Sequence, residues 1–122
     1  MKTTLTIQES AELIKRGVKR NKASGTYVGR WEHSSEGSFP DPESVEPLFT
    51  LADLLSLLPK HIPFANAEWY LNIQWEILWG KWHVQYLDFD HDNKVVKEEE
   101  APELIDALYL LTLAVINHVK LD

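Results

Sequence analysis

The stretch WYLNIQWEILWGKWHVQYLDF, residues 69–89, decides the fold because apolar and polar side chains alternate along most of its length. Such alternation is typical of strands that bury one face. The pattern is interrupted around Gly80 and then resumes, which predicts a hairpin of two antiparallel strands. If the turn is centred on Trp79 and Gly80, Trp75 faces Val84 across the strands. A bulged turn at Gly80 is an equal alternative, because a type I′ turn would require a positive φ at Trp79.

The two faces of the predicted hairpin differ in polarity. One face carries Glu76 opposite His83 and Gln74 opposite Gln85. The other face is apolar and consists of Trp69, Leu71, Ile73, Trp75, Ile77, Trp82, Val84 and Tyr86. We therefore expect helices to cover only one side of the sheet.

An acidic segment follows the hairpin and allows two interpretations. One is a calcium loop whose ligands, at loop positions 1, 3, 5 and 12, are Asp88, Asp90, Asp92 and Glu99. A strand precedes the segment, however, whereas a helix precedes an EF-hand loop. The alternative is a second hairpin in which residues 86–89 return through residues 94–97 around a turn at residues 90–93. Asp and Asn favour turns through local hydrogen bonds, so the turn is the preferred interpretation and requires no cofactor.

Capping signals predict a helix over residues 7–16. Thr6 and Glu9 have the spacing of a capping box, and Gly17 can close the helix in the left-handed conformation. The apolar stripe of this helix contains Ile7, Ala11 and Ile14, with Leu13 beside it. The segment therefore predicts a short amphipathic helix.

A second helix is expected over residues 51–58. Phe49 and Leu54 have the spacing of a hydrophobic staple at its start, and Pro59 ends it. A third helix begins at Pro102 and continues to about residue 119. Its apolar stripe contains Leu104, Leu108, Leu111 and Val115, and the acidic residues clustered at its positive end are Glu98, Glu99, Glu100 and Glu103.

These elements predict a single α+β domain over residues 1–122. Residues 26–32 are a further candidate strand, and residues 33–47 form a long loop because they show no periodic apolar pattern. We expect a three- or four-stranded antiparallel sheet with about three helices packed mainly on one face.

Composition limits the function classes. The chain has 122 residues and no cysteine, which excludes disulfides, thiolate metal sites and cysteine nucleophiles. No apolar signal core is found near the N-terminus, and the longest apolar stretch, residues 104–119, is interrupted by Asp106 and Asn117 and too short to cross a bilayer. A cytoplasmic protein without membrane contact is the expectation.

The net charge of −7 is unevenly distributed. Residues 1–30 contain seven basic and two acidic side chains, which leaves five basic and seventeen acidic ones for the remainder. The basic segment 15–22 could follow a phosphate backbone. The overall acidity and the lack of aromatic residues within that segment argue against nucleic-acid binding, and a cation at a helix C-terminus explains Lys15 and Arg16 equally well.

The sequence also argues against an enzyme. It contains no phosphate-binding glycine loop, HExxH motif, nucleophile elbow or dinucleotide fingerprint. The histidines His33, His61, His83, His91 and His118 fall on different predicted elements. No activated catalytic pair can be named.

Large apolar residues near the predicted turns suggest an interaction surface. Leu78 and Trp79 lie at the hairpin tip, and Phe39 is the one large apolar side chain of the long loop. Exposed aromatic side chains contribute strongly to interfaces, so these three residues are candidates for contact with a protein partner or a second copy of the chain. The alternative is that helices of the same chain cover Leu78 and Trp79.

Three stretches resemble a known group of proteins. They are SAELIKRG (residues 10–17) followed by NKAS (21–24), then FTLADLLSLLPK (49–60) and ELIDALY (103–109). Together they resemble a family of small uncharacterised proteins encoded by anaerobic gut bacteria and their phages or mobile elements. The resemblance implies an accessory role through binding of a protein partner and carries no catalytic residue with it.

Overall fold

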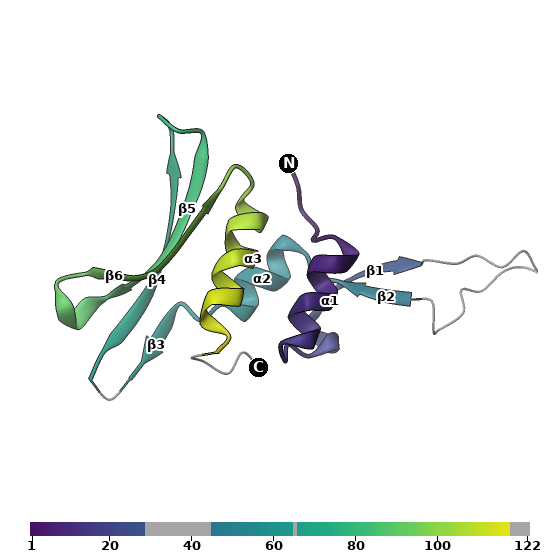
Figure 1. Ribbon diagram of the computed structural model, residues 1–122, viewed down its shortest axis with the longest axis horizontal. Coiled ribbons are helices and arrows are strands. Elements are labelled where there is room, and N and C mark those ends of the chain that lie inside the picture. The colour runs from purple at the N-terminus through teal and green to yellow at the C-terminus, as the bar shows by residue number, and fades with distance from the viewer. Residues whose placement is uncertain (29–44, 65, 118–122) are drawn as a thin grey trace, which may run out of the picture.

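The computed structural model describes residues 1–28, 45–64 and 66–117. Its largest element is a four-stranded antiparallel sheet with the strand order β3-β4-β5-β6 (Figure 1). The strands are β3 (His61–Pro63), β4 (Glu68–Glu76), β5 (Lys81–Asp88) and β6 (Lys94–Ala101). The prediction of an α+β fold with a four-stranded antiparallel sheet is confirmed, although the short strand β3 was not predicted.

The hairpin of β4 and β5 forms as predicted, but its register differs by two residues. Trp75 pairs with Trp82 instead of Val84. The turn comprises residues 77–80, and the Gly80 N–H closes it by donating to the carbonyl of Glu76 at 2.9 Å. Gly80 has a φ of 62°, so the turn needs no positive φ at Trp79. A shift of two residues leaves every side chain on its predicted face, because strand side chains alternate with a period of two.

The acidic segment forms the turn of a second hairpin, which confirms the preferred interpretation. The 3-10 helix η3 (Phe89–His91) and two left-handed residues, Asp92 and Asn93, connect β5 to β6. Strand β6 extends to Ala101 and therefore contains Glu98, Glu99 and Glu100. Their predicted location at the start of the last helix is wrong, because ladder pairing with β5 continues through these residues.

All three α-helices lie on the same side of the sheet, as Figure 1 shows. Helix α3 (Leu104–Val115) packs against β5 and β6, and α2 (Leu51–Leu57) packs against α3. Helix α1 (Ile7–Lys15) contacts the second, smaller sheet. The predicted capping box of Thr6 and Glu9 is present, and Gly17 has the expected positive φ of 110°.

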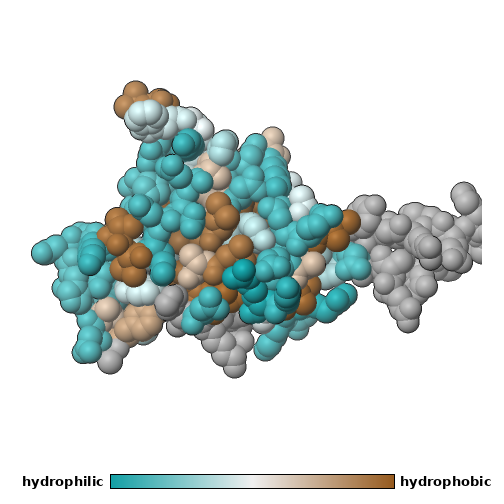
Figure 2. Space-filling view, viewed as in Figure 1, coloured by the Kyte–Doolittle hydropathy of each residue, from teal (hydrophilic) through white to brown (hydrophobic). Residues whose placement is uncertain are grey.

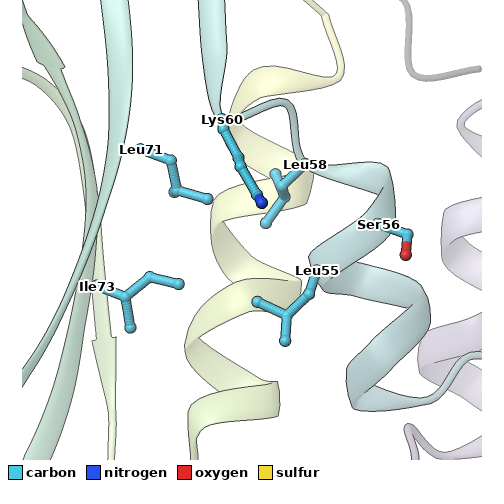
Figure 3. A pocket seen from close by; sticks show the side chains of 6 residues that line it. All are labelled: Leu55, Ser56, Leu58, Lys60, Leu71 and Ile73. Carbon is cyan, nitrogen blue, oxygen red and sulfur yellow. The ribbon is translucent and has the colours of Figure 1, made fainter.

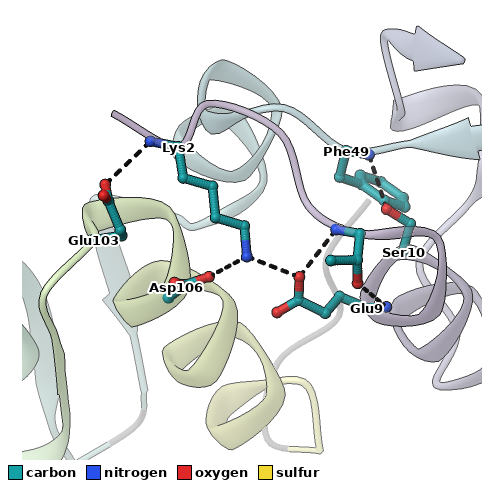
Figure 4. Close-up of polar contacts among 7 residues, drawn as sticks. Lys2, Glu9, Ser10, Phe49, Glu103 and Asp106 are labelled. Carbon is teal, nitrogen blue, oxygen red and sulfur yellow. Dashed lines mark hydrogen bonds and ion pairs between the residues drawn. The ribbon is translucent and has the colours of Figure 1, made fainter.

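The core extends from α1 through α2 and α3 to the sheet. Its fully buried side chains come from all four parts and include Leu13, Phe49, Leu54, Leu58, Val84, Tyr86, Ile105, Leu108, Leu111 and Val115. The stripe predicted for α1 is only partly correct, because Ala11 is exposed and the buried residues of this helix are Ser10 and Leu13. The Ser10 hydroxyl accepts a hydrogen bond from the Phe49 N–H at 3.1 Å and so joins α1 to the segment before α2 (Figure 4).

Ion pairs reinforce the contact between the N-terminal segment and α3. Lys2 Nζ lies 3.1 Å from Glu9 Oε1 and 2.7 Å from Asp106 Oδ1 (Figure 4). The Lys2 backbone N–H donates to Glu103 Oε2 at 3.2 Å. One lysine therefore links α1 to the start of α3.

A two-stranded sheet projects away from the helices (Figure 1). It consists of β1 (Gly25–Val28) and β2 (Val45–Leu48). Residues 45–47 were expected to be loop, and this prediction is wrong because they pair with β1. A Cβ atom at Gly25 would lie 2.9 Å from the carbonyl oxygen of Leu48, so the two strands approach as closely as only glycine permits there.

Candidate functional site

The turn between β4 and β5 exposes a continuous group of large apolar side chains. Ile77, Leu78 and Trp79 are 83%, 91% and 71% exposed, respectively. Trp75, on the adjoining end of β4, is also exposed and packs against Trp82 with ring centroids 5.3 Å apart. We call Trp75, Ile77, Leu78 and Trp79 the tip patch. Figure 2 shows hydrophobic atoms at this end of the hairpin.

The position of the turn explains why the tip patch remains uncovered. The hairpin extends beyond the helices that cover the sheet (Figure 1). The alternative prediction, that helices of the same chain cover Leu78 and Trp79, is therefore wrong for the part of the chain that the structure describes. Ile77 was expected on the apolar face of the hairpin strands, but the register shift places it in the turn instead.

The tip patch contains a hollow, and backbone hydrogen bonds fix the turn that carries it. A shallow hollow of about 330 Å³ is lined by Trp75, Glu76, Ile77, Leu78 and Trp79. The Glu76 carbonyl accepts hydrogen bonds from the N–H groups of Trp79 and Gly80, which hold the turn. Burial of each large apolar side chain against a partner would stabilise a complex by roughly 1.5–3 kcal/mol before the costs of association.

A charged cluster lies directly behind the tip patch on the polar face of the sheet. His83 Nδ1 is 2.7 Å from Glu76 Oε1, and His83 Nε2 is 3.0 Å from Glu98 Oε2. An ionised carboxylate only accepts hydrogen bonds, so both ring nitrogens donate when the imidazole is protonated. Partial burial lowers the pKa of His83, but the bonds and charges of the two glutamates outweigh it and raise this pKa above its ordinary value of 6.5.

The same cluster contains the side chains best placed to ligate a divalent cation. Ligand atoms of Glu76, His83 and Glu100 lie within 4.8 Å of one another. Glu100 is also 3.4 Å from Lys81 Nζ, and both ring nitrogens of His83 face carboxylates. A cation would have to displace the contacts between His83 and the glutamates and compete with Lys81 for Glu100, so the observed contacts favour an ion-pair network.

The four predicted calcium ligands do not converge. Asp88 pairs with Lys94 and Glu99 pairs with Val84, which places Glu99 about 16 Å along the strand from the turn. Asp88 Oδ2 is 2.7 Å from His91 Nδ1, and its Oδ1 accepts a hydrogen bond from the Asp90 N–H at 3.1 Å. These contacts are those of a turn.

The remaining acidic residues of the predicted calcium loop lie in the same turn. Asp90 belongs to η3, and Asp92 follows it in the left-handed conformation. Neither is brought to Glu99, so a loop of twelve residues around one ion is not formed. The sequence spacing was suggestive because the sequence did not show that the returning strand continues past residue 97 and carries Glu99 away from the turn.

The basic segment is divided by the fold. Lys15 ends α1, and the Nε of Arg16 donates to Glu12 Oε1 at 2.8 Å. Val18 is buried, and residues 20–22 form the 3-10 helix η1 (Arg20–Lys22). The segment therefore turns at the buried residue Val18 and does not form a continuous basic helix.

Of the three residues predicted to contact a partner, the structure brings two together. Leu78 and Trp79 are adjacent in the tip patch, whereas Phe39 lies outside the described residues. Trp75 and Ile77 also belong to the patch but were assigned to the buried face of the hairpin. A turn placed one residue earlier in the sequence, over residues 77–80, would have revealed Ile77.

Comparisons with known proteins provide no further assignment. No protein-family model, curated protein or solved structure matches the chain. Within residues 1–28, 45–64 and 66–117, no helix has the length and apolar character needed to span a membrane.

Proposed function

We propose that this protein is a non-enzymatic protein-interaction module that inserts Leu78 and Trp79 into a partner protein. The exposure of the tip patch is the observation that carries the proposal. Four large apolar side chains at one end of a hairpin are costly to leave in water and are typical of interface anchors. Their support is rigid, because the strands on both sides belong to a four-stranded sheet.

The resemblance of the sequence to small proteins of gut bacteria and their phages or mobile elements supports an accessory role. Such a role requires a partner and no chemistry of its own. A cytoplasmic location is part of this proposal, as is a partner that is a protein and not a nucleic acid. A second copy of the chain is one form that the partner could take.

A capture experiment with matched variants tests the proposal. The double variant Leu78→Ser/Trp79→Ser removes the anchors, and Phe89→Ser is the control because Phe89 is 63% exposed at the other hairpin turn of the same sheet. A partner should be retained by the wild-type chain and by Phe89→Ser but lost by the double variant. With the purified partner, Kd should increase at least about 30-fold on removal of the anchors.

Two results would contradict the proposal. One is an unchanged Kd for the double variant, which would place the interface elsewhere. The other is a double variant whose melting temperature falls by many degrees, because it would show that the patch stabilises the fold. Light scattering during size-exclusion chromatography distinguishes a homodimer from a heteromeric complex, since only the homodimer forms from the pure chain.

A further inference from the structure

A second apolar feature lies far from the turn, between α2 and the sheet. It is a groove of about 750 Å³ lined by Leu55, Ser56, Leu58, Lys60, Leu71 and Ile73. Figure 3 shows Leu55 from α2 and Leu71 and Ile73 from β4 pointing toward a shared space. This volume falls within the range of roughly 300–1,000 Å³ that is usual for small-molecule sites.

The arrangement of the helices explains why this groove is open. Helix α3 packs mainly against β5 and β6, so it leaves the β4 side chains Leu71 and Ile73 only half-buried. Leu55, on α2, is 38% exposed. Leu58, the residue directly after α2, is fully buried and lines the groove from below its surface. The described elements therefore leave this largely apolar groove uncovered.

A single cation lines this groove. Lys60 lies between α2 and β3, and its carbonyl accepts a hydrogen bond from the Leu71 N–H at 3.0 Å, which fixes its backbone against β4. Figure 3 shows its ammonium group close to Leu58 at the groove. The Lys60 side chain makes no hydrogen bond or ion pair with any residue among those that the structure describes. Lys60 is exposed, lies beside the four aliphatic side chains of the groove and has no carboxylate partner among the described residues, in a chain of net charge −7.

We propose that the groove binds an amphiphilic carboxylate, a straight-chain fatty acid of medium length. The alkyl chain would replace water on Leu55, Leu71 and Ile73, and the carboxylate would accept hydrogen bonds from Lys60 Nζ. Charge complementarity selects this ligand class, because a carboxylate adds an ion pair with Lys60 that an uncharged chain cannot make. This site is separate from the tip patch and does not depend on the proposed protein partner.

Calorimetric titration with decanoate and with 1-decanol tests the charge and the chain separately. The wild-type chain should bind decanoate more tightly than decanol. Lys60→Met keeps the aliphatic stem but removes the charge, so it should weaken decanoate binding about tenfold and leave decanol binding within about twofold. Leu55→Asp should weaken the binding of both ligands. Lys81→Met, on the opposite face of the sheet, is the matched control and should bind both ligands as the wild type does.

Three outcomes would overturn the inference. They are the absence of decanoate binding, equal weakening of decanoate and decanol by Lys60→Met, and equal effects of Lys60→Met and Lys81→Met. If Leu55→Asp fails to fold, the comparison of the two ligands on Lys60→Met still decides the question. The double variant Leu78→Ser/Trp79→Ser should bind decanoate normally, so a failure of the tip patch and a failure of the groove are distinguishable.

Discussion

His83 is the residue whose ionisation most directly affects contacts between strands of the sheet. Its ring bridges Glu76 on β4 and Glu98 on β6, so the protonated form links three strands. The sequence suggested the contact with Glu76 but not the contact with Glu98, because β6 was expected to end before Glu98. Three strands therefore meet at one imidazole on the face of the sheet that the helices do not cover.

The free energy of unfolding should fall as the pH rises above about 6.5 and through the raised pKa of His83, because His83 loses its proton. The pKa of His83 is raised in the folded protein, so its contribution is fully present below the unfolded pKa of about 6.5 and is lost as the pH rises through the folded pKa. We expect a loss of about 1 kcal/mol, since the glutamates are partly solvated. Urea unfolding between pH 5.5 and 8.5 measures it.

The comparison with His83→Gln isolates this residue from the other histidines. His61 and His91 also lie near carboxylates, at 3.6 Å from Glu68 and 2.7 Å from Asp88, and both are present in both proteins. The wild type should therefore show a steeper decline with pH than His83→Gln. Parallel curves for the two proteins would refute the role assigned to His83.

At the scale of elements, Asp53 is the acceptor that joins the start of α2 to the segment before β1. Its Oδ2 accepts hydrogen bonds from the Thr50 N–H at 2.8 Å, from the Ser24 N–H at 2.8 Å and from the Ser24 hydroxyl at 2.9 Å. Partial burial raises the pKa of Asp53, but these hydrogen bonds outweigh burial and keep this pKa below its ordinary value. The capping box of α2 is thus also a tertiary contact.

Asp53→Ala should destabilise the protein by about 1–2 kcal/mol, because it removes the Asp53 half of the capping box and leaves the N–H groups of Thr50 and Ser24 without their acceptor. Ser24→Ala removes only the hydroxyl bond and should cost less than about 1 kcal/mol. Chemical denaturation followed by circular dichroism measures both values. Equal losses for the two variants would mean that the Ser24 hydroxyl bond alone matters and that the capping bond to Thr50 does not, whereas no loss for Ser24→Ala would mean that the hydroxyl bond contributes nothing.

The elements differ in how far the sequence predicted them. Both capped helices carry their own signals, since a hydroxyl residue and a carboxylate three positions apart act within one turn. Strands β2 and β3 carry no such signal, because each has three or four residues and contains a proline. Only pairing with β1 and β4, respectively, makes them strands. Long-range pairing of this kind cannot be deduced from local periodicity.

The candidate sites were predictable to different degrees for the same reason. Leu78 and Trp79 were found because a turn interrupts the alternation of the hairpin. The groove was not found, because it depends on where α2 and α3 lie over the sheet. Lys60 has no local motif, and its importance comes only from the aliphatic side chains of β4 that face it.

At the scale of the whole molecule, the core connects parts of the chain that are distant in sequence. Leu13 of α1 belongs to the same buried cluster as Val84 of β5. The N-terminal segment adds backbone bonds, since the Leu5 N–H donates to the Phe49 carbonyl at 2.9 Å and the Leu51 N–H donates to the Thr3 carbonyl at 2.8 Å. One continuous core favours one cooperative unfolding transition.

The variant Leu13→Ala tests whether α1 and the sheet unfold together. Leu13 is completely buried, so its truncation should reduce the free energy of unfolding by about 3 kcal/mol. In a Trp31→Phe background, each remaining tryptophan lies in the β4–β5 hairpin, and fluorescence therefore reports on the sheet, whereas far-ultraviolet circular dichroism also reports on the helices. We expect both signals to shift to the same lower urea midpoint, although α1 is remote from the hairpin. A fluorescence midpoint that stays unchanged while the dichroism signal shifts would show two independent units and would contradict the single domain predicted from the sequence.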